Sequence, residues 1–210
     1  MKENRRPIKA RSAGWATGIT DALLKKDISP NQISMTSVVF ALSGVAALIL
    51  DSGVVGSIIC ALSIQLRLLC NLLDGMVAIE GGKQSRLGSL YNEFPDRVAD
   101  SVLIVGLGYA IGYSDLGWFG ALAAALTAYV RVFGGSIGLT QCFKGPMAKQ
   151  HRMALMTGAL LFNAIETAVY GTHLALVATL FIIVIGSLIT CGTRTLAIVR
   201  QLKENAHVDQ

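Results

Sequence analysis

Long apolar stretches recur along this 210-residue chain and constrain its fold more than any other feature. A helix that crosses a lipid bilayer needs about 20 predominantly apolar residues. Stretches that meet this requirement predict six transmembrane helices, over residues 33–50, 54–79, 88–112, 119–139, 153–171 and 174–199. We therefore expect an all-α polytopic membrane protein with no separate soluble domain.

The composition supports this fold class. Hydrophobic residues make up 53% of the chain and charged residues only 15%, whereas soluble domains carry about 25% charged residues. The same composition excludes a disordered chain. The four cysteines show no CxxC spacing and stand in or beside apolar runs, which favours buried thiols over disulfides or zinc ligands. No apolar stretch with a small-residue cleavage site follows the basic N-terminus, so we expect no cleaved signal peptide.

Basic residues define the expected orientation in the membrane. The predicted connections at 51–53, 113–118 and 172–173 contain no Lys or Arg, and the other connections hold most of the cations. The positive-inside rule then places the basic side in the cytoplasm, with a basic N-terminus over 1–12 and a tail over 200–210. A bacterial inner membrane suits this arrangement. The net charge of +5 indicates contact with anionic lipid headgroups rather than with nucleic acid.

The segment before the first predicted span, residues 13–29, is amphipathic. Four of its apolar residues share helical spacing: Trp15, Ile19, Leu23 and Leu24. We expect an interfacial helix on the cytoplasmic leaflet, with an ordinary ordered linker as the alternative. Asn31 or Ser34 is expected to cap the first spanning helix.

The second and third predicted spans are polar in their cytoplasmic halves. Ionisable residues within a span are costly, so they normally face a cavity or one another. Residues three or four apart share a helix face, which predicts two polar stripes: Asn71, Asp74 and Ala78 on one helix, and Gly88, Asn92, Asp96 and Asp100 on the next. A short loop makes the two helices antiparallel neighbours, so the stripes converge.

Carboxylate and amide oxygens suit Mg²⁺ or Mn²⁺ rather than zinc or copper. Gly75 and Gly88 leave room for close approach by a helix or a ligand. The alternative is that the charges only neutralise one another. In that case Asp96 or Asp100 pairs with an arginine of the same region: Arg67, Arg97 or Arg131.

The segment from Asn71 to Asp96 reads NLLDGMVAIEGGKQSRLGSLYNEFPD. It resembles the signature of the CDP-alcohol phosphotransferases, D-x2-D-G-x2-A-R, seven or eight residues, then G-x3-D-x3-D. Five positions match in residue and spacing: Asp74, Gly75, Ala78, Gly88 and Asp96. The sequence ISPNQIS before the first span also resembles the family's entry motif. The signature's first and third aspartates are replaced by Asn71 and Asn92, and its arginine by Ile79.

The resemblance implies a dimeric membrane domain of six spans, here 33–199, in which Mg²⁺ or Mn²⁺ holds the diphosphate of a CDP-linked lipid such as CDP-diacylglycerol. An alcohol attacks the lipid phosphate and CMP leaves. Carried onto this chain, it makes Asp96 the general base. The implied metal ligands are Asp74, Asp96, Asn71 and Asn92, with Asp100 as an auxiliary ligand or an arginine partner. The residues implied at the CDP diphosphate are Gly75, Ala78 and Gly88.

Cations near the same end suit a phosphorylated acceptor such as glycerol 3-phosphate. The candidates are Arg131, Lys149, Arg152 and Arg194. Serine, an inositol compound or a second lipid remain alternative acceptors. Two other readings stay open. The altered signature favours a degenerate member that binds CDP-lipid or a partner without turnover, and a small transporter or channel would use the ion pairs structurally.

Overall fold

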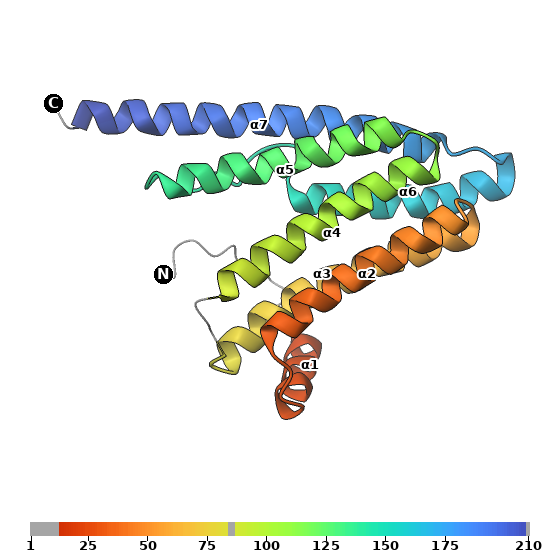
Figure 1. The fold of residues 1–210 in the computed structure, drawn as a ribbon, viewed down its shortest axis with the longest axis horizontal. Coiled ribbons are helices and arrows are strands. Elements are labelled where there is room, and N and C mark those ends of the chain that lie inside the picture. The colour runs from red at the N-terminus through yellow and green to blue at the C-terminus, as the bar shows by residue number, and fades with distance from the viewer. Residues whose placement is uncertain (1–12, 84–86, 209–210) are drawn as a thin grey trace.

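The computed structural model describes residues 13–83 and 87–208. These residues form an all-helical fold (Figure 1), as predicted. Its helices are α1 (Gly14–Lys25), α2 (Pro30–Leu50), α3 (Val54–Glu80), α4 (Gly88–Ala110), α5 (Ser114–Ser136), α6 (Lys149–Tyr170) and α7 (Leu174–Val208).

Five helices are long and apolar enough to cross a membrane: α2, α3, α5, α6 and α7. This number is one fewer than the six spans expected from the sequence. The missing helix is α4, whose first half carries four ionisable residues: Glu93, Asp96, Arg97 and Asp100. The same charged residues that suggested a site therefore separate α4 from the apolar helices.

The start of α2 corrects the expected helix cap. Ser29, rather than Asn31 or Ser34, caps this helix: its side chain accepts a hydrogen bond from the backbone N–H of Gln32 at 3.3 Å. The Gln32 side chain accepts one from the Ser29 N–H at 2.8 Å, which completes a capping box. Pro30 then occupies the first turn, where a missing N–H costs no hydrogen bond.

Two helix boundaries bear on the site. α6 begins at Lys149, four residues before the predicted 153, so that Lys149 and Arg152 belong to its first turn rather than to a loop. α7 runs to Val208, past the predicted end at 199, because its polar final residues continue the helix.

α1 lies within the expected segment, and Asp27 with a φ of 54° turns the chain away from it.

The helices pack around one shared core. α2 packs on α3 and α4, α5 packs on α4 and α7, and α6 packs on α3 and α7. The core between them contains Leu48, Ile64, Leu103, Met156 and Leu180. The three connections without Lys or Arg lie together at the right-hand end in Figure 1. Toward the left-hand end, α5 and α7 diverge from α2 and α3.

Close approach of α4 and α5 depends on glycine. A Cβ atom at Gly108 would lie 2.8 Å from the Cα atom of Gly117, which is closer than real Cβ contacts. Two glycines therefore let the backbones of α4 and α5 touch near the crowded end of the molecule. From there the helices separate toward the polar end.

Candidate functional site

The two predicted polar stripes do meet. Asn71 on α3 donates from Nδ2 to Oδ1 of Asp96 on α4 at 2.8 Å. The helices themselves are arranged differently from the expected close pair, because α4 packs chiefly on α2 and α5 and reaches α3 through polar side chains. The stripes thus converge across a gap between helix backbones.

Asp96 is the most heavily contacted carboxylate of the described residues in this region. Its Oδ2 atom forms an ion pair with Lys149 Nζ. Arg67 donates from Nη2 to the backbone carbonyl of Asp96 at 3.1 Å and lies 3.7 Å from Oδ1. Arg97 Nη2 lies 3.9 Å from Oδ2. Both carboxylate oxygens of Asp96 therefore face hydrogen-bond donors from α3 and α6.

Asp74 has a different environment. It is 5% exposed, and its Oδ2 atom accepts a hydrogen bond from Ser34 of α2 at 2.7 Å. Over the described part of the chain, no Lys, Arg or His nitrogen lies within 4.0 Å of this carboxylate. Asp96 and Lys149 are near enough to act on it electrostatically. Asp74 is therefore a buried carboxylate without a direct ion pair.

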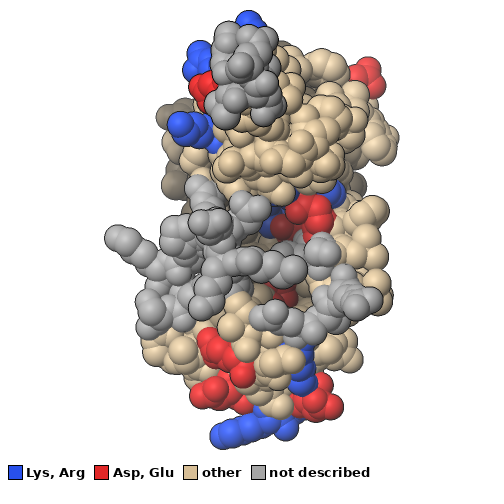
Figure 2. Space-filling view, turned by 90° about the vertical axis from the view of Figure 1, so that its left-hand side faces the viewer, with Lys and Arg blue, Asp and Glu red and all other residues tan. Residues whose placement is uncertain are grey.

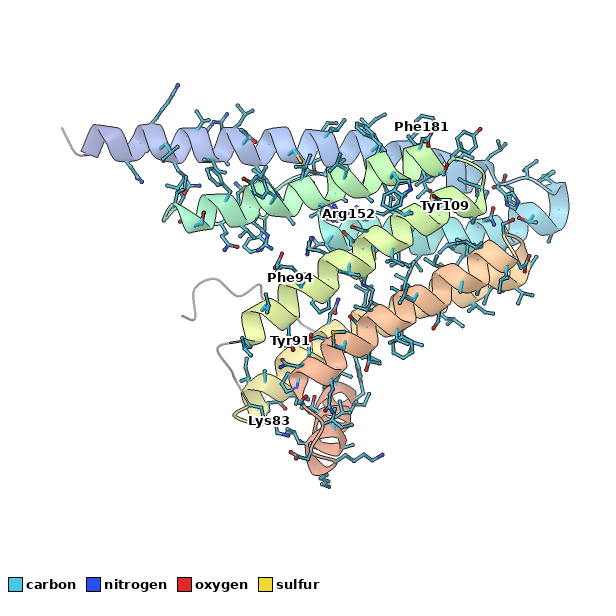
Figure 3. The ribbon with its side chains drawn as sticks, in the orientation of Figure 1. Lys83, Tyr91, Phe94, Tyr109, Arg152 and Phe181 are labelled. Atoms are coloured by element: carbon cyan, nitrogen blue, oxygen red, sulfur yellow. The ribbon has the colours of Figure 1, made fainter. Side chains whose placement is uncertain are left out.

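Asp100 lies one turn further along α4 and is held by two arginines. Arg152 Nη2 donates to Asp100 Oδ2 at 2.6 Å, and Arg67 Nη1 lies 3.9 Å from Oδ1. Arg152, labelled in Figure 3, also donates to the Met147 carbonyl at 2.6 Å. Arg67 and Arg152 are both fully buried. Asp100 therefore ties α3, α4 and α6 together, and it pairs with Arg67 and Arg152 rather than with Arg97 or Arg131.

Arg131 lies at the edge of the site. It donates to Glu93 Oε1 at 2.7 Å and to Gln141 Oε1 at 2.8 Å, and its guanidinium stands 5.2 Å from the centre of the Phe143 ring. Sequence reasoning did not predict roles for Glu93, Gln141 or Phe143. Only Glu93 carried a signal, since it is an acid next to the polar stripe of α4.

Arg194 is engaged with backbone rather than with acidic side chains. It donates from Nη1 to the Thr127 carbonyl at 2.6 Å and from Nε to the Lys144 carbonyl at 3.1 Å. It thereby fixes the connection between α5 and α6 to α7. Of the four predicted phosphate-binding cations, Lys149, Arg131 and Arg152 each pair with a carboxylate, and Arg194 contacts backbone carbonyls. Arg152 and Arg194 are buried.

The small residues of the signature lie at the same end. Gly75 and Ala78 stand one turn apart on α3 and are half-buried, and Gly88 is the first residue of α4. Ile79 is exposed. Asn92 lies on α4 one turn before Asp96, but its side chain falls outside the part of the chain that the structure describes, as do residues 1–12 and Arg86.

The end view in Figure 2 shows acidic and basic residues near the middle of the molecule, beside uncharged residues, and further charged residues at its upper and lower ends. Among the described residues, no group of three or more His, Cys, Asp or Glu side chains is placed to hold a metal ion. The oxygen donors that the site offers are two carboxylates, Asp74 and Asp96, and the carbonyl oxygen of Asn71, whose NH₂ group serves Asp96. The buried charge of Asp74 and this all-oxygen donor set fit one hard divalent cation.

The fold is shared with solved enzymes of phospholipid synthesis. Crystal structures of Mycobacterium tuberculosis phosphatidylinositol phosphate synthase match with TM-scores of 0.76 for the form with CDP-DAG bound and 0.75 for the complex with manganese and citrate. Each is 18% identical to this chain. The first match covers 89% of this chain and 94% of the other, and the second covers 87% and 88%. At this identity the likeness shows the fold.

A curated relative points the same way. The chain is similar to the phosphatidylinositol phosphate synthase of Streptomyces avermitilis, with 26% identity over 194 residues that cover 87% of this chain and 77% of that protein. No family model matches the chain. Phosphatidylinositol phosphate synthase is itself a CDP-alcohol phosphatidyltransferase, so these relatives support the resemblance of the Asn71–Asp96 segment.

Proposed function

We propose that this chain is an integral-membrane CDP-alcohol phosphatidyltransferase that moves a phosphatidyl group from CDP-diacylglycerol or a similar lipid to an alcohol. The observation that carries the proposal is the contact between Asn71 and Asp96, which occupy the first and last aspartate positions of the signature and lie 2.8 Å apart. The solved neighbour with CDP-DAG bound supports the same donor lipid.

Asp96 serves as the general base in this proposal. Its carboxylate accepts the proton of the acceptor hydroxyl, and the acceptor oxygen attacks the β-phosphorus of the CDP-lipid. The bond between that phosphorus and the bridging oxygen breaks, and CMP leaves. A positioned carboxylate contributes about 10²–10⁴-fold to such a step. Asp96 must first exchange its contact with Lys149 for one with the acceptor.

Asp74, Asp96 and the carbonyl oxygen of Asn71 would hold the divalent cation, Mg²⁺ or Mn²⁺, and a solved neighbour in complex with manganese supports this choice. Bound there, the cation would polarise the phosphoryl oxygens and stabilise the leaving group. Asn92 and Asp100 stay predicted ligands, although Asp100 would have to leave Arg152 to take part. Gly75, Ala78 and Gly88 present little side-chain bulk, which lets the CDP diphosphate approach the helix backbones.

The acceptor in this proposal is a phosphorylated alcohol. Lys149 and Arg131 supply cationic groups at the edge of the site, and charge-assisted hydrogen bonds favour a phosphate there. Arg152 and Arg194 hold the framework around the site through backbone carbonyls. The name of the curated relative favours an inositol phosphate over glycerol 3-phosphate, and the basic edge suits either.

We further propose that α4 completes six spans in a bacterial inner membrane, with the termini and the site in the cytoplasm. The three connections without Lys or Arg then face outward. α1 lies in the interface, where Trp15 is 53% and Ile19 38% exposed and both reach the lipid. We also propose a homodimer of this domain, which the family resemblance implies.

A degenerate binding protein is the second candidate. Asn71 and Asn92 each remove a negative charge from the signature, Ile79 removes its arginine, and Lys149 already occupies one oxygen of Asp96. Such a protein binds CDP-lipid without turnover. This candidate predicts lipid binding that persists in Asp96→Asn.

The deciding experiment measures CMP release by the purified protein from CDP-diacylglycerol with Mg²⁺ or Mn²⁺. The acceptors are an inositol phosphate, glycerol 3-phosphate, inositol and serine, and Asp96→Asn serves as the matched variant. Metal-dependent CMP release with one acceptor, lost in Asp96→Asn, supports the transferase. Binding of CDP-lipid with no CMP release from any acceptor overturns it in favour of the degenerate protein.

A further inference from the structure

Lys149 is held opposite Asp96 by the way α6 begins. It is the first residue of that helix, and Arg152 in the same turn is fully buried against the Met147 carbonyl and Asp100. The helix start is therefore fixed relative to α4. The Lys149 ammonium reaches Asp96 from this fixed position and is paired with its Oδ2 atom.

The ion pairs around Asp96 form one connected network. With Asp74 included, its cationic side chains are Arg67, Arg97, Arg131, Lys149 and Arg152, and its carboxylates are Asp74, Glu93, Asp96 and Asp100. The described part of the network thus has one more positive than negative charge before any metal binds. Asn71 and Asn92 stand at two aspartate positions of the signature, so two negative charges are missing here. Two negative charges are the number that would balance one divalent cation.

A divalent cation at Asp96 must therefore displace a positive charge. Arg67 and Arg152 cannot easily give way, because their side chains are 0% exposed and each contacts other groups of the framework. Lys149 is 24% exposed and its ammonium sits at the end of a flexible chain. An ammonium that donates to a carboxylate oxygen also occupies a position that a cation needs.

We infer that Lys149 competes with the divalent cation for Asp96 and sets the metal affinity of this site. Metal binds well only when the Lys149 ammonium has moved off Asp96. The inference rests on the proposed function, because it requires that the site takes a divalent cation. It assigns to Lys149 control over the binding of that cation, before any chemical step.

The test measures Mn²⁺ binding directly, by the electron paramagnetic resonance signal of free Mn²⁺ titrated into the purified full-length chain without CDP-lipid. Lys149→Gln and Lys149→Met should bind Mn²⁺ about ten- to hundredfold more tightly than the wild type, since a neighbouring like charge is removed. Lys149→Arg keeps the charge and should bind as the wild type does. Lys144→Gln is the matched control. Lys144 is exposed in the connection between α5 and α6, and the variant removes the same positive charge.

Equal or weaker Mn²⁺ binding in both Lys149→Gln and Lys149→Met overturns the inference, as does an equal gain in Lys144→Gln. Absence of Mn²⁺ binding in every variant also overturns it. Failure of the proposed function has a different signature, since no acceptor then supports CMP release whatever the Mn²⁺ affinity. Metal-dependent CMP release with unchanged Mn²⁺ affinity in the Lys149 variants sinks the inference alone.

Discussion

Asn71 and Asp96 share a hydrogen bond in which the amide of one helix donates to the carboxylate of another, 2.8 Å away. An aspartate at position 71 could not make this contact, because two carboxylates at that distance repel each other. Asn71 therefore stabilises the site without a metal. Compared with an aspartate, it provides one negative charge fewer to attract a cation.

Asn71→Asp should lower stability without metal and raise it with metal. A second carboxylate beside Asp96 should cost about 1–3 kcal/mol in the absence of a divalent cation. Added Mn²⁺ should then raise the melting temperature of Asn71→Asp more than that of the wild type. Thermal unfolding with and without Mn²⁺ measures both effects. Identical melting temperatures for the two proteins under both conditions would contradict the role given to Asn71.

Ser34→Ala should raise the Mn²⁺ concentration that CMP release requires, without unfolding the protein. Ser34 donates to Asp74 at 2.7 Å, and a hydrogen bond to a charged group contributes about 1.5–3 kcal/mol. Loss of this bond leaves the Asp74 carboxylate less well oriented, so half-maximal CMP release should need about tenfold more Mn²⁺. Ser34→Thr retains the hydroxyl and should restore the wild-type metal dependence. An unchanged metal dependence in Ser34→Ala would count against Asp74 as a metal ligand.

Arg152→Met should destabilise the protein strongly. The substitution leaves Asp100 buried with only the 3.9 Å contact to Arg67, and breaking a buried ion pair costs about 3–5 kcal/mol. The double variant Arg152→Met with Asp100→Asn should recover part of this loss, because no unpaired carboxylate then remains. Unfolding curves of the two variants give the comparison, with Arg200→Gln on the exposed part of α7 as a neutral control. A double variant less stable than Arg152→Met would show that Asp100 does not depend on Arg152.

Asp51 should make stability depend on pH at the far end of the molecule. Backbone N–H groups of Gly56 and Gly53 donate to its carboxylate at 3.0 and 2.8 Å and lower its pKa from the usual 3.8. A lowered folded-state pKa gives stability that is fully present above the unfolded value and is lost as pH falls through the folded value. Asp51→Asn should therefore melt below the wild type at pH 7 and approach it as pH falls below 3.8. A constant difference across that range would rule out this carboxylate as the cause.

Much of the fold follows from local sequence. The apolar stretches locate the five long apolar helices, and the spacing of Asn71, Asp96 and Asp100 correctly brings polar stripes of two helices together. The partners of those residues were harder to predict. Ser34 contacts Asp74 from 40 positions away, and Arg152 reaches Asp100 from 52 positions away. Such pairs depend on how helices pack, which a periodic pattern in one helix does not contain.

The misplaced start of α6 has the same origin. Lys149 and Arg152 look like loop cations because they precede the apolar run. Inside the fold each finds a carboxylate on α4, and the helix extends through them. A charged first turn is thus stabilised by tertiary ion pairs that no local rule of composition anticipates.

The connection between α5 and α6 is fastened to α7 at three levels. Thr190 accepts from the Met147 N–H at 2.9 Å, Arg194 donates to the Lys144 carbonyl, and Gln201 exchanges two hydrogen bonds with Thr140 at 3.0 and 3.2 Å. The ribosome makes this connection before it makes the helix that fastens it. We therefore expect this connection, and with it the start of α6 at Lys149, to gain these contacts only after α7 has been synthesised.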